Sequence, residues 1–125
     1  MLDFQLYDEP RGKVLKLGGQ LDTDTAPELT PTISGLRQGT PDVLILDLAG
    51  LTYISSAGLR CVFQLKKLMQ SSGGRFVIRE PSPQVQKVFD IVKAVPVKSV
   101  FSSAEELDAY LDAMQKKVAD ENDFL

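Results

Sequence analysis

Residues 44–65, LILDLAGLTYISSAGLRCVFQL, constrain the fold of this chain more than any other stretch. The branched apolar run at its start predicts a buried central strand over residues 43–48. After a short connector come two adjacent serines, Ser55 and Ser56, and a helical pattern follows them. One of these serines can cap the helix, because its hydroxyl can accept a hydrogen bond from a free backbone N–H group. The same position favours an anion, so the serines are either a cap alone or also a switch.

The rest of the chain alternates short strand patterns with helical patterns. Strands are predicted over residues 4–7, 14–17, 43–48 and 75–79, with a short edge strand within 95–101. Helices are predicted from about 25 to 38, 57 to 70, 83 to 92 and 104 to 118. The first two strands form a hairpin, and Gly18 and Gly19 are expected to end the second strand. This order predicts an α/β fold with a mixed sheet of four to five strands, parallel in its later strands, and about four helices.

The amino-acid composition excludes several common kinds of catalytic site. The chain has no histidine and one cysteine, Cys61, which removes the Ser–His nucleophile pair, most zinc sites and an internal disulfide. Cys61 falls within the helical pattern and is predicted to be a buried, inert thiol. The glycine pairs at 18–19 and 73–74 match no phosphate-binding loop. We therefore expect no enzymatic activity, no metal and no cofactor.

The net charge and the hydropathy of the chain limit which partners it can bind and where in the cell it is expected. The net charge of −3 argues against nucleic acid, since phosphate binding needs a surplus of Lys and Arg. No apolar run approaches the ~18 residues of a membrane span, and the first residues do not form a signal peptide. We therefore expect a cytoplasmic protein, either a monomer or a weak dimer. One domain is expected over residues 1–118, followed by a disordered acidic tail at 119–125.

The helix predicted after the serines has one clearly apolar face, which we expect to pack on the sheet. That face contains Gly58, Cys61, Val62, Leu65, Leu68 and Met69. Leu59 and Phe63 fall on the flank of this face. They are either packed under the next helix or exposed for a partner, and the sequence favours neither.

Three short motifs occur in the order and spacing of a known family. They are Gly19-Gln20-Leu21-Asp22 with Thr25, Leu46-Asp47-Leu48 with Leu51, and Tyr53-Ile54-Ser55-Ser56-Ala57-Gly58-Leu59-Arg60. Together they resemble the STAS domain family, the sulfate transporter and anti-sigma factor antagonist domains. The resemblance covers nearly the whole chain and, within the family, is to the stand-alone bacterial anti-sigma factor antagonists. It implies a STAS-like single-domain fold.

The resemblance implies a partner-switching module that binds an anti-sigma factor, which is itself a serine kinase. That kinase would phosphorylate a serine at the turn, and a PP2C-type phosphatase would reset it. Carried over by position, the phosphorylated serine is Ser56. Ser55 stands where the family has an aspartate, so Ser55 is the alternative acceptor, and a member without phosphorylation is the other alternative. The resemblance also implies a set of partner-binding residues: Asp22, Thr23, Ser55, Ser56, Ala57, Gly58, Leu59, Arg60 and Phe63.

A phosphate at this turn is expected to act on the partner rather than on the fold. It adds about −1.5 to −2 charge at neutral pH. At a helix start, the dipole and free N–H groups favour an anion, so the domain itself should tolerate the phosphate. We therefore expect Ser56→Asp to weaken partner binding with little loss of stability.

Three other functions compete with this one. The first is a STAS scaffold or transporter-associated subunit, which would act through permanent contacts without phosphorylation. The second is a small-nucleotide binder, although no residue cluster suggests a base or ribose pocket. The third is a phosphoaspartate receiver at Asp47, which would need an acidic pair after the first strand, at the carboxyl edge of the sheet. Asp8 and Glu9 lie in the predicted hairpin turn instead, so the receiver is disfavoured.

Overall fold

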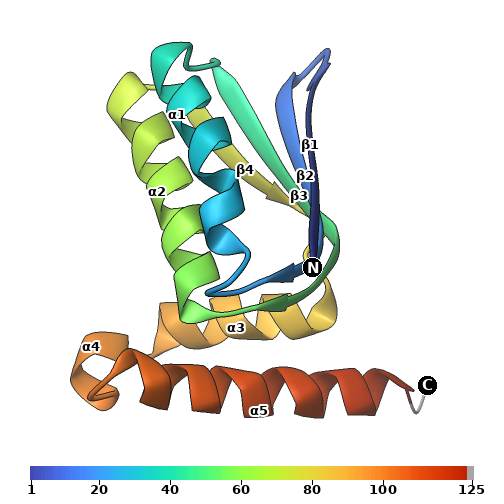
Figure 1. Ribbon diagram of the computed structural model, residues 1–125, viewed down its shortest axis with the longest axis vertical. Helices are drawn as coiled ribbons and strands as arrows, with labels where there is room; N and C mark the ends of the chain where they lie inside the picture. Colours follow the sequence, from blue (N-terminus) through green and yellow to red (C-terminus); the bar gives the residue numbers. More distant parts are fainter. Residues whose placement is uncertain (124–125) are drawn as a thin grey trace.

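The computed structural model has a four-stranded sheet with helices on one face and across one end (Figure 1). It describes residues 1–123. Along the chain the elements are β1 Leu2–Glu9, β2 Gly12–Leu21, the 3-10 helix η1 Ala26–Leu29, α1 Thr30–Gln38, β3 Val43–Ile54, α2 Ser56–Ser72, β4 Arg75–Arg79, α3 Pro83–Ala94, α4 Val97–Val100 and α5 Ala104–Asp123.

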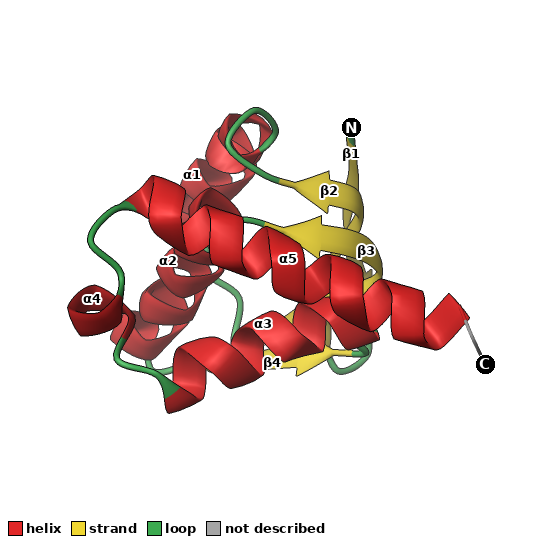
Figure 2. Ribbon diagram, turned by 90° about the horizontal axis from the view of Figure 1, so that it is seen from below, coloured by secondary structure: helices red, strands yellow, loops and turns green. Residues whose placement is uncertain are grey.

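The sheet has the order β1-β2-β3-β4, with β1 antiparallel to β2 and the other pairs parallel. The predicted mixed α/β sheet is therefore confirmed, with four strands. The two parallel connections run in the same direction across the sheet, and right-handed crossovers then place α1 and α2 on the same face (Figure 1). Helices α3 and α5 lie side by side across the end of the sheet where β3 finishes (Figure 2).

The diglycine at 18–19 does not end β2, which continues to Leu21. The pairing of β2 with β3 instead shifts register on either side of these glycines, between Lys16 and Gly18 and between Gly19 and Gln20. Gly19 has a φ of +88°, and a Cβ atom there would overlap the carbonyl oxygen of Met1. The glycines therefore form bulges within a longer strand. Strand β3 is correspondingly longer than predicted and includes the expected connector.

The prediction of an edge strand within residues 95–101 is wrong. The single turn α4 occupies this segment, and the amides of Ser99 and Val100 both donate to the carbonyl oxygen of Pro96. Three apolar residues of the segment 95–101 pack against the core without joining the sheet: Val95, Val97 and Phe101. Local turn hydrogen bonds thus replace the ladder that a strand would need, and contact with the core accounts for the apolar residues of this segment.

Helix α5 starts as predicted but ends later. The hydroxyl of Ser103 accepts a hydrogen bond from the amide of Glu106 at 3.1 Å and so caps the first turn. The helix then passes residue 118 without a break and reaches Asp123. The segment expected to be a disordered tail is therefore helical over 119–123, and residues 124–125 lie outside the described part of the chain.

One hydrophobic core lies between the sheet and the helices. Five of the six residues expected on the sheet-facing side of α2 are buried, and Leu68 is half-buried. Cys61 is one of the buried residues, and burial raises the pKa of its thiol, as expected of an inert cysteine. None of the helices within residues 1–123 is both long and apolar enough to span a membrane.

The sheet face opposite α1 and α2 carries an ion-pair network. Asp47 points to this face, since its neighbours along β3 point into the core. Its Oδ2 accepts from Arg79 Nη2 at 3.0 Å, and Arg79 Nη1 also donates to Glu9 Oε2 at 2.9 Å. Burial alone would raise the pKa of Asp47, but the amide of Ala49 and the Arg79 guanidinium outweigh it and hold that pKa below its ordinary value. Asp47 is thus a structural ion-pair partner within a strand, which argues further against a receiver aspartate.

Candidate functional site

Ser55 is the buried N-cap of α2. Its backbone is extended, with φ −97° and ψ 178°, and its Oγ accepts from the amide of Gly58 at 3.3 Å. Its own amide donates to the carbonyl oxygen of Leu21 at 2.9 Å, which ties the turn to the end of β2. Only 3% of Ser55 is exposed. Its hydroxyl is therefore committed to capping and is shielded from solvent.

Gly58 sets how closely α2 approaches the end of β2. A Cβ atom at this position would lie 2.7 Å from the carbonyl oxygen of Leu21 and 2.8 Å from Cγ1 of Ile54. Both distances are shorter than van der Waals contact, so a larger residue would push the helix outward. Glycine at this point thus fixes the position of the two serines relative to the strands.

Ser56 is the first residue of α2, and a carboxylate from a distant helix holds it. Its amide donates to Oδ1 of Asp108 at 2.8 Å, and its hydroxyl donates to Oδ2 of the same carboxylate at 2.9 Å. Asp108 lies on α5, 52 residues further along the chain. Sequence reasoning missed this residue, because nothing in the local pattern of the last helix marks one acidic residue among several.

A second side chain of α5 binds the other side of the same turn. Gln115 Nε2 donates to the carbonyl oxygen of Ile54 at 2.8 Å, and its Oε1 accepts from the Ile54 amide at 2.9 Å. The residue is 3% exposed. Gln115 therefore satisfies backbone groups at the buried end of β3 that the sheet leaves without a partner. Sequence analysis missed it too, although its place four residues after the buried Leu111 puts a polar side chain on the apolar face.

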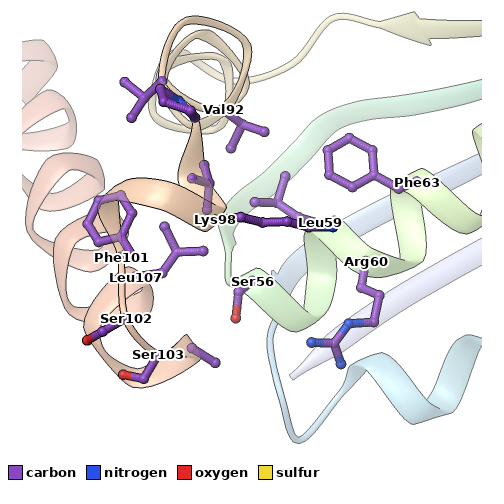
Figure 3. Close-up of a pocket in the computed structure, with 14 residues that line it drawn as sticks. Ser56, Leu59, Arg60, Phe63, Val92, Lys98, Phe101, Ser102, Ser103 and Leu107 are labelled. Carbon is purple, nitrogen blue, oxygen red and sulfur yellow. The ribbon is translucent and has the colours of Figure 1, made fainter.

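Ser56 lies at the border of an apolar groove of about 810 Å³ between α2, α4 and the start of α5. Figure 3 shows Leu59 and Phe63 along α2, with Phe101 and Leu107 on the opposite wall. The two flank residues of α2 differ, since Leu59 is 4% exposed and Phe63 is 46% exposed. One is thus packed and the other is open to solvent. Of the expected partner-binding set, four residues line this groove: Ser56, Leu59, Arg60 and Phe63.

Comparison with known families and structures identifies the fold. A family model described as STAS domain matches residues 3–107. This chain belongs to the STAS domain family. The expectation drawn from the three motifs is thereby confirmed.

Relatives of this STAS chain are named as regulators rather than as enzymes. An anti-sigma F factor antagonist from Lysinibacillus sphaericus is 32% identical over 77 residues, which cover 61% of this chain and 66% of that relative. An anti-sigma-B factor antagonist from Staphylococcus epidermidis is 35% identical over 78 residues, covering 62% of this chain and 71% of the relative. The chain thus spans about two thirds of the length of these proteins.

The fold also matches a solved anti-sigma factor antagonist, SpoIIAA, in two states. Its unphosphorylated form gives a TM-score of 0.60 at 28% identity, over 71% of this chain and 83% of that one. The phosphorylated form from Bacillus gives 0.61 at 25% identity, over 78% and 96% of the two chains. Sequence and fold similarity therefore agree on the anti-sigma factor antagonist branch of the STAS family.

The first STAS motif forms a tight turn at the end of β2. The carboxylate of Asp22 accepts from the amides of Asp24 and Thr25, each at 3.0 Å, so Asp22 stabilises the turn that follows β2. Asp22 is half-buried and Thr23 is exposed. Neither residue lines the groove, so a partner that touches them must extend beyond it.

Carboxylates lie around the turn that holds Ser56, whereas the groove that Ser56 lines also has two basic residues, Arg60 and Lys98. Burial raises the pKa of Tyr53, and the carboxylates of Asp112, Asp108 and Asp22 raise it further. Among residues 1–123, no basic side chain lies within ion-pair distance of Asp108. The Asp108 carboxylate is thus held by neutral donors alone.

Proposed function

We propose that this chain is an anti-sigma factor antagonist whose binding is switched off by phosphorylation of Ser56. The antagonist role follows from the relatives and from the SpoIIAA structures. The chain would act in the cytoplasm by binding its partner rather than by catalysis. The observation that carries the choice of serine is exposure, since Ser56 borders the open groove whereas Ser55 is 3% exposed.

The proposed modification is a phosphoryl transfer from ATP to Ser56. The bond from Oγ to the γ-phosphorus forms, and the bond from that phosphorus to the bridging oxygen of ADP breaks. ADP leaves and the hydroxyl proton passes to solvent. The kinase would be the anti-sigma factor itself, and a PP2C-type phosphatase would use water to release inorganic phosphate and restore the hydroxyl.

The groove supplies the proposed binding surface for the anti-sigma factor. Exposed apolar side chains such as Phe63 beside buried ones such as Leu59 suit an apolar side chain of a partner. A phosphate at Ser56 adds about −1.5 to −2 charge at the border of this surface. Desolvating that charge and placing it against a partner would cost several kcal/mol, and each ~1.4 kcal/mol weakens binding tenfold.

The test is phosphorylation in vitro by a candidate anti-sigma factor kinase, with the site mapped by mass spectrometry. We expect phosphate on the wild type and on Ser55→Ala, and none on Ser56→Ala. Phosphorylated protein should then bind the anti-sigma factor at least tenfold more weakly in calorimetry. Phosphate found at Ser55, or equal affinity with and without phosphate at Ser56, would overturn the proposal.

A matched pair of variants tests the groove. Phe63→Ser removes an exposed aromatic ring from the groove, and Phe4→Ser removes a comparably exposed ring from β1, outside the groove. We expect Phe63→Ser to weaken binding of the anti-sigma factor and Phe4→Ser to leave it unchanged. Equal effects of the two variants would place the binding surface elsewhere.

One observation favours a second function, that of a STAS subunit without phosphorylation. The hydroxyl of Ser56 already donates to Asp108 and is not free. A permanent subunit would co-purify with its partner in a stoichiometric complex, and none of the candidate kinases would phosphorylate it. Stoichiometric co-purification together with absent phosphorylation would therefore select this function.

A further inference from the structure

The N-terminus of α2 already holds an anion, and that anion belongs to α5. The carboxylate of Asp108 accepts both from the amide and from the hydroxyl of Ser56. Two later amides of the first turn are also engaged, because Gly58 donates to the hydroxyl oxygen of Ser55 and Leu59 donates to its carbonyl oxygen. The amides of Ser56, Gly58 and Leu59 are thus in use, and the Asp108 carboxylate occupies the position at the Ser56 amide that a phosphate would favour.

We propose that phosphorylation of Ser56 displaces Asp108 and thereby loosens the N-terminal half of α5, so that this helix responds to the state of the serine. The inference rests on the proposed function, because it takes Ser56 as the phosphorylated residue. In addition to the direct effect of the phosphate charge on a partner, phosphorylation would change the conformation of α5.

The chemistry of the two groups drives the displacement. A serine hydroxyl donates to a carboxylate, but a phosphorylated serine has lost that proton and carries acceptor oxygens only. The hydrogen bond from Oγ to Asp108 is therefore lost, and the phosphate competes with Asp108 for the amide of Ser56. Two anions that accept from one N–H group repel each other, and among residues 1–123 no basic side chain forms an ion pair with Asp108 that would offset this repulsion.

Several acidic groups near the site add to this repulsion. Asp22 and Asp112 also face the neighbouring Tyr53, and Glu105 and Glu106 lie in the first turn of α5. Two basic residues, Arg60 and Lys98, line the groove together with Ser56 (Figure 3), and neither makes an ion pair with Asp108. A phosphate that turned toward Arg60 or Lys98 would leave Asp108 in place, which is the main competing outcome.

The loosening should stop before the middle of α5. Seven residues after Asp108, Gln115 binds the backbone of Ile54 through neutral, buried hydrogen bonds that the phosphate does not touch. Leu111, between them, is fully buried. These residues should hold the second half of α5 on the core while residues 104–110 move.

The moving part would change the groove. Leu107 of α5 lines it, and the ring of Tyr110 lies 5.3 Å from that of Phe101, which also lines it. A shift of residues 104–110 therefore moves one wall of the binding surface. The partner would meet both a new charge and an altered shape.

The test is amide hydrogen exchange, followed by mass spectrometry, on the full chain with and without phosphoserine incorporated at position 56 during translation. We expect exchange in residues 104–110 to become at least tenfold faster with the phosphate, and exchange in β1, β2 and β3 to stay unchanged. Unchanged exchange in residues 104–110 of the phosphorylated wild type would overturn the proposal.

Two variants separate a specific role of Asp108 from a general effect of charge. In Asp108→Asn the phosphoserine should accelerate exchange less than twofold, because the repelled charge is gone. Asp112→Asn is the matched control, since Asp112 lies one turn further on α5 and pairs with Lys116 rather than with Ser56. It should keep the tenfold response, and an equal response in all three proteins would also contradict the proposal.

The test does not depend on the kinase or the partner. Phosphoserine is incorporated during translation, so unchanged exchange would contradict the coupling between Ser56 and α5 even if a kinase modifies Ser56 and partner binding is lost. Conversely, faster exchange in residues 104–110 with unchanged partner affinity would support the coupling and contradict the proposed function. The two failures are therefore distinguishable.

Discussion

Two carboxylates of this domain, Asp47 and Asp108, are each held by hydrogen bonds from other residues, but the donors differ in charge. Asp47 binds the guanidinium of Arg79 and the amide of Ala49 on the sheet face without helices. Asp108 binds the amide and the hydroxyl of Ser56 at the end of the sheet. One carboxylate has a cation as its partner, and the other has neutral donors only.

This difference separates a fixed contact from a responsive one. An ion pair with Arg79 keeps its attraction whatever happens to nearby hydroxyls, and Arg79 is held further by Glu9. A contact made by neutral donors lasts only while the donors keep their protons, and no attraction between charges remains when one is modified. Asp47 is therefore suited to holding the sheet, and Asp108 to sensing a change at Ser56.

The largest effect should come from breaking the ion-paired contact. Asp47→Asn removes the charge from charge-assisted hydrogen bonds, and we expect the free energy of unfolding in urea to fall by about 2 kcal/mol. Asp8→Asn is the control, since Asp8 is 80% exposed in its pair with Lys13 and should cost roughly 0–0.5 kcal/mol. If the two variants cost the same, the contrast between Asp47 and a surface carboxylate fails.

The pH dependence of the free energy of unfolding should also show the contribution of the Asp47 ion pair. Burial pushes the pKa of Asp47 up, but the Ala49 amide and Arg79 hold it below its ordinary value. A carboxyl group with a lower pKa in the folded state stabilises the fold above its unfolded pKa, and this contribution is lost as the pH falls through the folded value. The stability gap of up to about 2 kcal/mol between wild type and Asp47→Asn should be constant above about pH 5 and shrink below about pH 4. Urea titrations at several pH values measure it, and a gap that widens in acid would contradict the assignment.

A smaller effect is expected from the neutral contact. In Asp108→Asn the amide oxygen still accepts from one donor of Ser56, but the NH₂ group cannot accept from the other. We expect a loss of about 1 kcal/mol in the free energy of unfolding. Asp112→Asn, which loses only an exposed pair with Lys116, should cost about 0.3–0.5 kcal/mol. A cost of Asp108→Asn as large as that of Asp47→Asn would remove the distinction between the two carboxylates.

The parts of this architecture that sequence reasoning predicts are those with a local cause. The apolar run at residues 43–48, the capping serine before α2 and the apolar face of α2 all follow from periodicity and from turn chemistry within a few residues. The prediction that the glycine pair at 18–19 ends a strand was wrong, because the same residues that end strands also form bulges. The short helix α4 lies in a segment predicted as a strand, since a short segment with several apolar residues fits either structure.

The contacts that define the site have no such local cause. Asp108 and Gln115 reach the turn from 52 and 61 residues away, and their partners include backbone groups that carry no side-chain identity. Only the packing of α5 across the end of the sheet brings them to Ser56 and Ile54. The sequence therefore indicates where the serines lie but not which anion faces them.

The smallest effect, and the last way to separate the two serines, comes from removing the Ser56 hydroxyl itself. Ser56→Ala keeps the amide that donates to Asp108 at 2.8 Å, and alanine is the better helix former, so we expect a change of only about 0–0.5 kcal/mol in the free energy of unfolding. Ser55→Ala removes a buried N-cap and should cost about 1 kcal/mol. Urea unfolding of the two variants side by side makes the comparison. A greater loss in Ser56→Ala than in Ser55→Ala would mean that the hydroxyl bond to Asp108 stabilises the fold, and a kinase would then have to break a structural contact to reach Ser56.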